Sequence, residues 1–394
     1  MSNKNKNKNI YLKHSRKTRP EHRRRIFVAM SGGVDSSVAA LLLKKQGYDV
    51  TGVFMRCFNL DGCSERDAED ARRVTEHLGI PFYVFDFEEE YKRDVVEYMV
   101  DGYKRGITPN PDVVCNKYVK FGLFLKRALA LGADHIATGH YVRIAKTTDR
   151  KLLTTHYQLL TARDSAKDQS YFLWTLTQNE LKHCLFPIGD YIKSQVRKIA
   201  KKAGLPTAEK KDSQGVCFLG KVSVHDFLKQ YIPENHGDIV TVEGKKIGEH
   251  EGAQFYTIGQ RHIGVANRGL ALNGRRRTQK SNMKPLYVTE KNIKTNTLVV
   301  AEGDENPALF KKEVELRNVN IINPQHSHIL QNVRMSVLAR VRYRQPLAKA
   351  ELTLNKKTAK LVFDKPQKFV APGQSAVFYS DKGELLGGGV VDGT

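Results

Sequence analysis

The chain has no long apolar run. Its 394 residues include no window of roughly 18 uninterrupted apolar side chains, the length with which a helix crosses a membrane. The longest apolar stretches, such as residues 38–43, have only the length of a helix core. Because 40% of the residues are hydrophobic, the chain can still bury more than one core, and its length indicates about two or three domains. We expect a soluble globular protein that does not enter a membrane.

Cysteine is scarce. The five cysteines are scattered and odd in number, which argues against a disulfide scaffold and favours a protein of the reducing cytosol, so we expect a cytoplasmic location. Cys57 and Cys63 have the wrong separation for a C-x-x-C motif. By default they have no role, with a local disulfide or a metal site as the alternatives. Cys184, in L-K-H-C-L-F at 181–186, is most simply a core residue.

Acidic residues are outnumbered. The chain has 42 Asp and Glu residues and 65 Lys and Arg residues, which gives a formal net charge of +23. Such an excess favours a polyanionic partner, with nucleic acid as the first candidate. The alternative is a solvated basic surface that only aids solubility.

The first 25 residues have few hydrophobic side chains and are rich in Asn, Lys and Arg. They lack the apolar region of a secretory signal and the amphipathic pattern of an organellar transit peptide. We therefore predict a disordered basic arm.

Short apolar runs alternate with helix-period stretches from about residue 26 to residue 139. The predicted strands are 26–30, 50–55, 82–85 and 135–138, and the predicted helices are 35–46, 66–78, 95–103 and 117–131. This alternation predicts a parallel sheet with helices on both faces. Ligands of such sheets bind at the carboxyl ends of the strands.

After about residue 227 the pattern changes to short strands separated by turn signals. They are predicted at 239–242, 286–289, 298–301, 333–340, 360–363 and 376–379. The last third of the chain is therefore predicted to be a small β domain or barrel. A long basic loop at 268–280 interrupts the middle region.

The segment S-G-G-V-D-S-S at 31–37 lies between a predicted strand and a predicted helix. Its two glycines let the backbone turn sharply and present N–H groups to an anion, and the helix adds its positive dipole end. The serine hydroxyls can donate to phosphate oxygens, and Asp35 can hold Mg²⁺. The alternative is an ordinary glycine-rich turn in which Asp35 caps the helix. The strand–loop–helix order favours a phosphate site.

This loop is not a Walker loop, because no Lys-Ser/Thr pair follows its second glycine. It resembles the pyrophosphate loop of the ATP pyrophosphatase superfamily. Enzymes with that loop cleave ATP between the α and β phosphates and pass AMP to an oxygen of the substrate. The loop therefore predicts the activation step and leaves the acceptor open.

Two further segments carry cysteines. In T-P-N-P-D-V-V-C-N-K at 108–117, a helix is predicted to begin at Lys117, which places Cys115 near a helix N-terminus, where a thiol pKa is lowered. Asp112 could orient or deprotonate a neighbour. The alternative for Cys115 is a small buried hydrophobe. In K-D-S-Q-G-V-C-F-L-G at 211–220, Cys217 follows a polar, glycine-containing loop that suits a residue moving into and out of a site.

Together with the phosphate loop, these segments give the chain a resemblance from residue 26 to its C-terminus. It is similar to the bacterial tRNA-specific 2-thiouridylases, which replace oxygen by sulfur at position 2 of the wobble uridine. The motifs are T-P-N-P-D-x-x-C-N at 108–116, A-T-G-H-Y at 137–141, K-D-Q-S-Y-F at 167–172, D-S-x-G-x-C-F at 212–218, a variant of T-x-G-Q-R at 257–261, R-Y-R-Q at 342–345 and P-G-Q-S-A-V-F-Y at 372–379.

The resemblance implies an α/β fold in which a parallel-sheet, Rossmann-like ATP pyrophosphatase domain is followed by a small central domain and a C-terminal β-barrel. The expected divisions are 1–25 for the disordered arm, 26–222 for the catalytic domain, 223–297 for a central tRNA-binding domain and 298–394 for the barrel. The N-terminal arm lies outside the resemblance.

The resemblance also implies a tRNA uridine 2-sulfurtransferase that uses ATP and Mg²⁺ and releases AMP and pyrophosphate. Adenylation turns the uridine 2-oxygen into a leaving group, and sulfur then displaces it. Cys217 would receive a persulfide from a sulfur donor, either a cysteine desulfurase or a sulfur-relay protein. Cys115 would be the nucleophile that resolves this persulfide. Direct attack by the terminal sulfur and prior release of hydrosulfide both stay open.

The implied site residues form three groups, and no resident metal site is predicted. ATP would contact Ala29, Met30, Ser31, Gly32, Gly33, Val34, Asp35, Ser36, Met55 and Gly139. The target base would contact Asn110, Pro111 and Asp112, with Asp112 as the acid or base. The tRNA would contact His140, Lys167, Asp168, Gln169, Arg342, Tyr343 and Gln374. For each of these charges the alternative is a solvated side chain, and for His140 it is a structural histidine. The arm and the 268–280 loop are expected to contact the tRNA without specificity.

Three rival hypotheses stay open. An amidotransferase-type synthetase or a tRNA lysidine synthetase would keep the loop and add nitrogen, without needing the paired cysteines. A second rival makes the cysteines ligands of an iron–sulfur cluster, with Asp112 as a third ligand. A non-catalytic RNA-binding protein would bind ATP only as a ligand and release no pyrophosphate.

Overall fold

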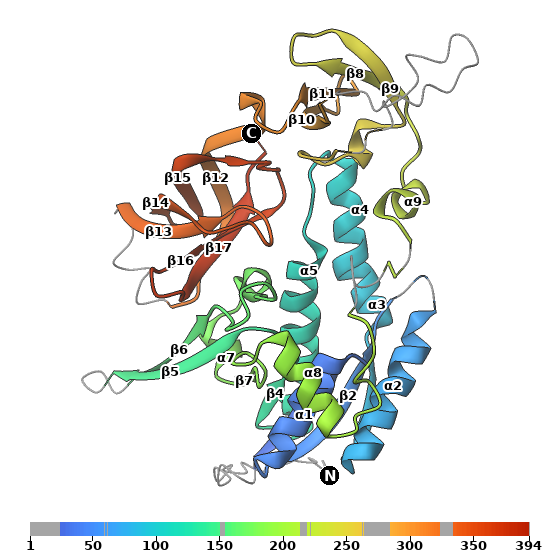
Figure 1. The fold of residues 1–394 in the computed structure, drawn as a ribbon, viewed down its shortest axis with the longest axis vertical. Coiled ribbons are helices and arrows are strands. Elements are labelled where there is room, and N and C mark those ends of the chain that lie inside the picture. Colours follow the sequence, from blue (N-terminus) through green and yellow to red (C-terminus); the bar gives the residue numbers. More distant parts are fainter. Residues whose placement is uncertain are drawn as a thin grey trace, which may run out of the picture.

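The computed structural model describes residues 24–58, 60, 62–149, 154–212, 219–220, 222–261, 263, 284–323 and 334–393. These residues form an α/β domain, a small central sheet and a C-terminal barrel (Figure 1). Residues 1–23 of the basic arm predicted over 1–25, the basic loop at 268–280 and Cys217 lie outside the described residues. Within the described ranges, no helix is long and apolar enough to cross a membrane.

The first domain is built on a five-stranded sheet with the order β3-β2-β1-β4-β7, and every neighbouring pair is parallel. The strands are β1 (Arg25–Met30), β2 (Asp49–Arg56), β3 (Phe82–Asp86), β4 (His135–Ala137) and β7 (Cys184–Leu185). The four predicted strands are confirmed. The sequence did not predict β7, but Cys184, expected in the core, is buried in it.

Helices cover both faces of this sheet. One face packs against α1 (Val34–Lys45), α2 (Cys63–Leu78) and α8 (Lys193–Lys202). The other packs against α3 (Glu88–Tyr91), the π-helical segment η2 (Lys92–Val96), α4 (Glu97–Lys104) and a helix that runs over 111–130. The predicted helices at 35–46 and 66–78 are confirmed to within a few residues.

The helix over 111–130 begins earlier than predicted. It consists of α5 (Pro111–Val114), the π-helical segment η3 (Cys115–Phe124) and α6 (Leu125–Ala130), which follow one another without a break. Asn110 caps its first turn, because its side-chain oxygen accepts from the backbone N–H of Val113 at 3.3 Å. The predicted start at Lys117 was therefore wrong. The capping asparagine and the following proline set the start of the helix.

A hairpin and two short elements connect the sheet to its last strand and to α8. They are β5 (Arg143–Asp149), β6 (Thr154–Leu160), η4 (Ser170–Leu173) and α7 (Gln178–Leu181). The central body follows, with α9 (Val224–Lys229), η5 (Ala253–Phe255) and a sheet of order β10-β11-β8-β9. Its strands are β8 (Gly237–Thr241), β9 (Lys246–His250), β10 (Leu286–Asn292) and β11 (Thr297–Glu302).

The C-terminal body is a closed antiparallel barrel, preceded by the short turn η7 (Pro307–Leu309). Its strands are β12 (Phe310–Ile321), β13 (Arg334–Arg340), β14 (Ala348–Asn355), β15 (Thr358–Lys368), β16 (Ser375–Tyr379) and β17 (Leu385–Val391). The expected barrel is confirmed, although β12, β14 and β17 were not predicted individually. A separate hydrophobic cluster fills its interior.

The barrel packs directly on the first domain. The indole N–H of Trp174 donates to the Ser375 hydroxyl at 3.0 Å, and the Tyr171 hydroxyl donates to the Ser375 carbonyl at 2.9 Å. A Cβ at Gly388 in β17 would lie 2.8 Å from the Trp174 ring, so this strand needs a glycine at the contact. These contacts hold the barrel against the 170–174 turn.

Candidate active site

The loop between β1 and α1 is a fixed turn. The backbone N–H of Ser31 donates to the Ser36 hydroxyl at 3.1 Å, and that hydroxyl lies 3.2 Å from the Gly33 carbonyl, to which it donates. Gly32 has a φ of +67°, and a Cβ there would lie 2.3 Å from the carbonyl oxygen of Asp67 in α2. Only glycine fits this position, and the turn delivers the chain to the N-terminus of α1, where an anion is stabilised.

Met55 and Gly139 lie at the same edge of the sheet as this loop. Met55 is the penultimate residue of β2, and Gly139 comes two residues after β4. A Cβ at Gly139 would lie 2.6 Å from the backbone nitrogen of Ser36, so the two segments touch. The carboxyl ends of β1, β2 and β4 therefore bring all the residues expected to contact ATP to one edge.

Beside the phosphate loop lies a cluster of ion pairs that the sequence did not predict. The Lys193 ammonium lies 2.8 Å from both carboxylate oxygens of Asp35 and 2.8 Å from Oδ1 of Asp212. Asp212 also pairs with Lys167 at 2.6 Å and with Arg197 at 2.7 Å. We call these five side chains the phosphate-loop cluster. No local motif marks Lys193, although the absence of a Walker lysine could have prompted a search for a cation elsewhere.

The cluster is electrostatically strong. Burial by itself would raise the pKa of Asp212, but hydrogen bonds from Lys167 and Lys193 outweigh it and lower that pKa from 3.8 to about 2. Asp212 is therefore ionised at neutral pH. Lys167, expected to contact tRNA, points instead to this cluster.

Cys115 lies in the second turn of its helix. Its side chain is 5% exposed and packs in the main core cluster of the α/β domain. Its backbone N–H already bonds to the Pro111 carbonyl, so the expected position at a helix N-terminus was wrong by about one turn. Cys217, its expected partner, lies outside the described residues.

Asp112 lies in the first turn of the same helix and is half-buried. Burial raises the pKa of its carboxyl above 3.8, and the positive charge of Lys120 opposes that rise. Asn110, Pro111 and Asp112, expected at the target base, thus form one capped turn that ends beside Cys115. A carboxyl with a raised pKa in this turn suits proton transfer.

The barrel holds the segment that leads to this helix. The Gln374 side-chain amide donates to the carbonyl oxygens of Thr108 at 3.0 Å and Pro109 at 3.2 Å. The backbone N–H of Thr108 donates to the Pro372 carbonyl at 2.8 Å. Gln374, expected to contact tRNA, uses its amide N–H groups to fix the approach to Cys115.

The 167–169 segment also makes internal bonds. Asp168 is buried, and its carboxylate accepts from the backbone of Ala162 and pairs with Arg340 in β13 at 3.2 Å. The Gln169 side-chain oxygen accepts from the backbone N–H of Tyr141 at 2.9 Å. These two expected tRNA contacts therefore connect the phosphate-loop region to the barrel.

His140 is buried between aromatic rings, with ring centroids 5.8 Å from Phe121 and 6.4 Å from Phe186. Its Nδ1 lies 2.7 Å from the Thr138 hydroxyl. Burial lowers the pKa of His140 well below 6.5, and Lys120 adds to that effect. A neutral, buried ring matches the structural alternative that the sequence left open.

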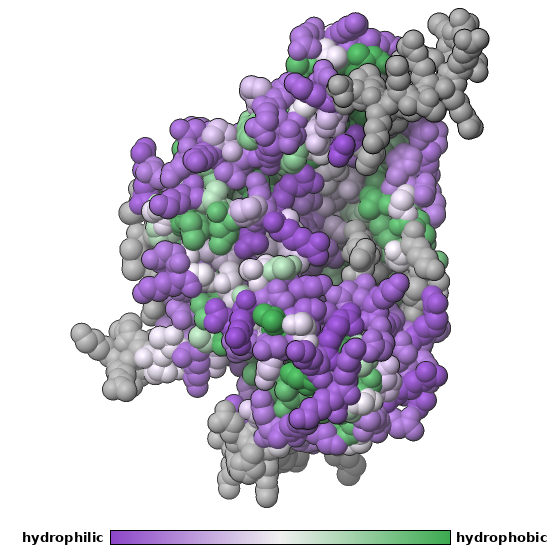
Figure 2. Space-filling view, in the orientation of Figure 1, coloured by the Kyte–Doolittle hydropathy of each residue, from purple (hydrophilic) through white to green (hydrophobic). Residues whose placement is uncertain are grey.

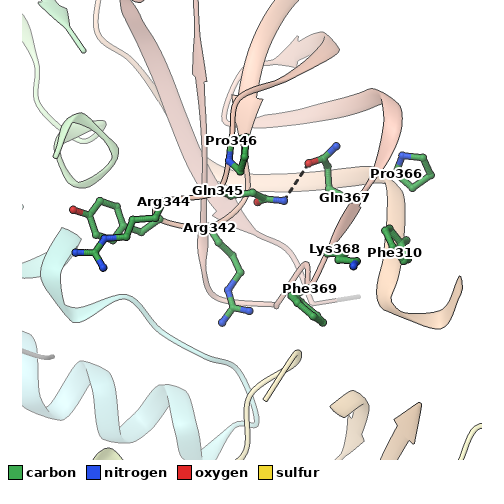
Figure 3. A pocket seen from close by; sticks show the side chains of 10 residues that line it. Phe310, Arg342, Arg344, Gln345, Pro346, Pro366, Gln367, Lys368 and Phe369 are labelled. Carbon is green, nitrogen blue, oxygen red and sulfur yellow. Dashed lines mark hydrogen bonds between the residues drawn. The ribbon is translucent and has the colours of Figure 1, made fainter. Parts of the chain in front are cut away.

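Arg342 and Tyr343 line a groove at one end of the barrel with a volume of about 660 Å³ (Figure 3). The Arg342 guanidinium lies 5.9 Å from the Phe369 ring centroid, and the Tyr343 ring lies 4.4 Å from that of Phe172. Arg344, also in the groove, has a φ of +64°, which is strained for a side chain of its size. Cations beside aromatic faces suit an unpaired RNA base and its phosphate.

The surface around this region is mainly hydrophilic, and Figure 2 shows it hollowed between the barrel and the central sheet.

Cys57 follows β2 and packs half-buried on the main core, while Cys63 begins α2. In the described part of the chain, no group of three or more His, Cys, Asp or Glu side chains could hold a metal ion.

Three family models match the chain in succession. They are described as a tRNA methyl transferase HUP domain at 24–221, a tRNA methyl transferase PRC-barrel domain at 225–302 and an aminomethyltransferase beta-barrel domain at 311–391. Curated relatives match over nearly the whole length. The tRNA-specific 2-thiouridylase MnmA of Bacillus licheniformis is 45% identical over 95% of this chain and 96% of its own. Those of Streptococcus mutans and Staphylococcus aureus are 42% and 43% identical over 93% of this chain and 95% of theirs.

The chain belongs to the tRNA-specific 2-thiouridylase family. Both the resemblance and the three-part fold expected from it are confirmed. In this 2-thiouridylase fold, the HUP match covers the parallel sheet with the phosphate loop, and the last match covers most of the closed barrel. Among solved structures, a 4-thiouridine synthetase in complex with RNA and ATP is 18% identical over 52% of this chain and 50% of its own. Its TM-score of 0.33 is too low to carry an argument.

Proposed function

We propose that this chain thiolates the wobble uridine of tRNA at position 2, using ATP to activate the uridine oxygen and a cysteine persulfide to supply the sulfur. The observation that carries the proposal is the near full-length identity of 42–45% to proteins named tRNA-specific 2-thiouridylase. The descriptions of the family models mention methyl transfer, but each model matches only one domain. The relatives named 2-thiouridylase match all three domains, so we base the proposal on them.

The phosphate loop supports ATP as the co-substrate. Its backbone N–H groups and the N-terminus of α1 would hold phosphates, while the backbones near Met55 and Gly139 would border the adenosine. Mg²⁺ commonly binds through one or two carboxylates together with substrate phosphates, so Asp35 is the residue that fits it. The bound ion would offset phosphate charge.

In the activation step, the uridine 2-oxygen attacks the α-phosphorus of ATP. The bond between that phosphorus and the β-phosphate oxygen breaks, and pyrophosphate leaves with the electron pair. Asp112 would accept the uridine N3 proton, and the rise in the pKa of its carboxyl on burial supports this role, because it makes the group a better base than an exposed aspartate. The uridine now carries AMP on its 2-oxygen.

Sulfur transfer then uses the two cysteines. The terminal sulfur of a Cys217 persulfide, loaded by a desulfurase or relay protein, forms a bond to uridine C2 and AMP leaves. Cys115 attacks the Cys217 sulfur, which leaves 2-thiouridine and a Cys115–Cys217 disulfide. If Cys115 acts first, the same disulfide forms and hydrosulfide performs the attack on C2. In both routes a cellular thiol must reduce the disulfide before the next cycle.

The groove with Arg342 and Tyr343, together with the +23 charge, supports tRNA as the polyanionic partner. The described hydrogen bonds and ion pairs of residues 167–169, His140 and Gln374 are all internal. These residues would therefore act on tRNA binding only by supporting the surface that contacts the tRNA.

The deciding experiment supplies the protein with ATP, a persulfide donor and unmodified tRNA. Digested tRNA is examined for 2-thiouridine, and the solution for AMP and pyrophosphate. The proposal requires all three products. Cys115→Ser and Cys217→Ser should abolish 2-thiouridine, and Cys184→Ser is the matched control because Cys184 is a buried cysteine of β7 that takes no part in the proposed steps.

The rivals give different results in the same assay. A nitrogen-adding synthetase would be indifferent to Cys115→Ser, and a non-catalytic RNA-binding protein would release no pyrophosphate. An iron–sulfur enzyme would show visible absorbance after purification without oxygen, whereas a persulfide enzyme would not.

A further inference from the structure

The Lys193 ammonium occupies an unusual position. It is the first residue of α8, its side chain is 14% exposed, and its Nζ lies between the carboxylates of Asp35 and Asp212. Its backbone N–H is fixed as well, because it donates to a carboxylate oxygen of Asp164 at 2.8 Å. A positive charge is thus delivered to the phosphate loop from a residue 158 positions away from Asp35.

The phosphate loop needs such a cation. Backbone N–H groups carry only partial charges, and a triphosphate carries several full negative charges. The loop itself contains no lysine or arginine, unlike a Walker loop. Lys210, another nearby cation, is already bonded to Asp67 and Asp70 of α2 at 2.6 Å each.

Lys193 can change partners without stranding a buried charge. Asp212 keeps its bonds to Lys167 and Arg197, and Asp35 keeps a hydrogen bond from the Tyr141 hydroxyl at 2.8 Å. Both carboxylate partners of Lys193 thus have other donors, and Lys193 is the one of the cluster's three cations that bonds Asp35 in the loop.

We propose that Lys193 is the catalytic cation of the phosphate loop, which exchanges Asp35 for the β- and γ-phosphate oxygens when ATP binds. This inference rests on the proposed function. As the uridine 2-oxygen bonds to the α-phosphorus, the bond to the β-phosphate oxygen breaks and its electron pair passes to pyrophosphate. The Lys193 ammonium neutralises the charge that builds on this leaving group, and no proton is transferred.

The exchange also gives a reason for the ion pair between Asp35 and Lys193. An aspartate at the mouth of an anion site would repel phosphate unless it were neutralised. Lys193 neutralises it before binding, and its departure frees the Asp35 oxygens at the moment the phosphates arrive. Lys193 would therefore pair with Asp35 before ATP binds and with the phosphate oxygens afterwards.

The test uses full-length Lys193→Gln and Lys193→Arg, with Lys198→Gln as the matched control because Lys198 is exposed on the same helix. Calorimetry measures the affinity for ATP and for AMP, and a tRNA-dependent assay measures pyrophosphate release. We expect Lys193→Gln to bind ATP roughly ten- to a hundredfold more weakly while AMP affinity stays within about twofold. Its rate of pyrophosphate release should fall by at least a comparable factor, and Lys193→Arg should recover part of both losses.

Two outcomes overturn the inference. One is unchanged ATP affinity and turnover in Lys193→Gln. The other is an equal loss of ATP and AMP affinity, which would mean that Lys193 only supports the fold. If wild-type protein releases no pyrophosphate with tRNA, the proposed function fails instead, so the two failures are distinguishable.

Discussion

Arg340 in β13 and Asp168 form an ion pair inside the molecule, with Nη2 and Oδ2 3.2 Å apart and only 9% and 3% of the two side chains exposed. In the chain, Arg340 is two positions before Arg342, which lines the groove. On the other side, Lys167 and Gln169 bond to Asp212 and to the backbone of Tyr141. One short segment therefore joins the barrel to the phosphate-loop cluster.

Removing one member of this pair should be costly, because it leaves a buried charge without its partner. We expect Arg340→Met to lower the free energy of unfolding by about 3–5 kcal/mol. The double variant Asp168→Asn with Arg340→Met should lose less than the single variant. Urea denaturation measures both. The exposed pair of Arg334 with Glu351 is the control, and Arg334→Met should cost under about 1 kcal/mol.

The two loop glycines should respond differently to a methyl group. Gly32→Ala must place a Cβ 2.3 Å from the Asp67 carbonyl at a φ of +67°, so it should destabilise the fold by at least about 1–2 kcal/mol and weaken ATP binding. Gly33 has an extended backbone, and its Cβ would meet the Ser31 hydroxyl at 3.4 Å. Gly33→Ala should therefore melt within a few degrees of wild type. Equal melting temperatures for the two variants would contradict the loop geometry.

Stability should fall as pH drops below 6.5 because of His140. In the unfolded chain this histidine takes up a proton near its ordinary pKa of 6.5, whereas burial keeps the folded side chain neutral to a much lower pH. Protonation therefore favours the unfolded state. Urea unfolding at about pH 7.5 and about pH 5.5 should show a smaller drop for His140→Gln than for wild type. His236→Gln, at an exposed position, is the control, and an equal drop in both variants would refute the assignment.

Arg342→Gln should weaken tRNA binding and reduce its salt dependence. Affinity for tRNA falls as salt rises, so a plot of log affinity against log salt has a negative slope. Loss of one phosphate contact should make this slope shallower by about 1. Arg334→Gln, at the far end of β13 and outside the groove, should leave the slope unchanged. Filter binding between low and moderate salt measures both. A slope that is the same in wild type and Arg342→Gln would remove this side chain from the tRNA interface.

Local patterns predicted most of the parallel sheet and the phosphate loop. A turn such as 31–37 is determined by neighbouring residues, which is why its glycines and serines could be read directly. The strand β17 escaped prediction because its three glycines, 387–389, are atypical of strands. At Gly388 a glycine is needed because Trp174, far away in the chain, packs against this position.

Long-range pairing accounts for what the sequence did not predict at the site. Lys193 acquires its role only when the fold brings it to Asp35, and no spacing rule joins residues 158 positions apart. The start of the helix before Cys115 was predictable in principle, because Asn110 followed by Pro111 is a standard helix-start pattern. The internal bonds of Asp168 and Gln374 were not, since both cross from one domain to another.

The hydrogen bonds that join Gln374 and Pro372 of the barrel domain to Thr108 and Pro109 have a consequence for protein engineering. The segment before Cys115 is therefore held by residues 372–374 of the barrel domain. A chimera that exchanges the barrel while altering residues 372–374 should lose alignment at Cys115 even if each half folds. The barrel and the helix of Cys115 should therefore be exchanged together, although 266 positions separate Gln374 from Thr108.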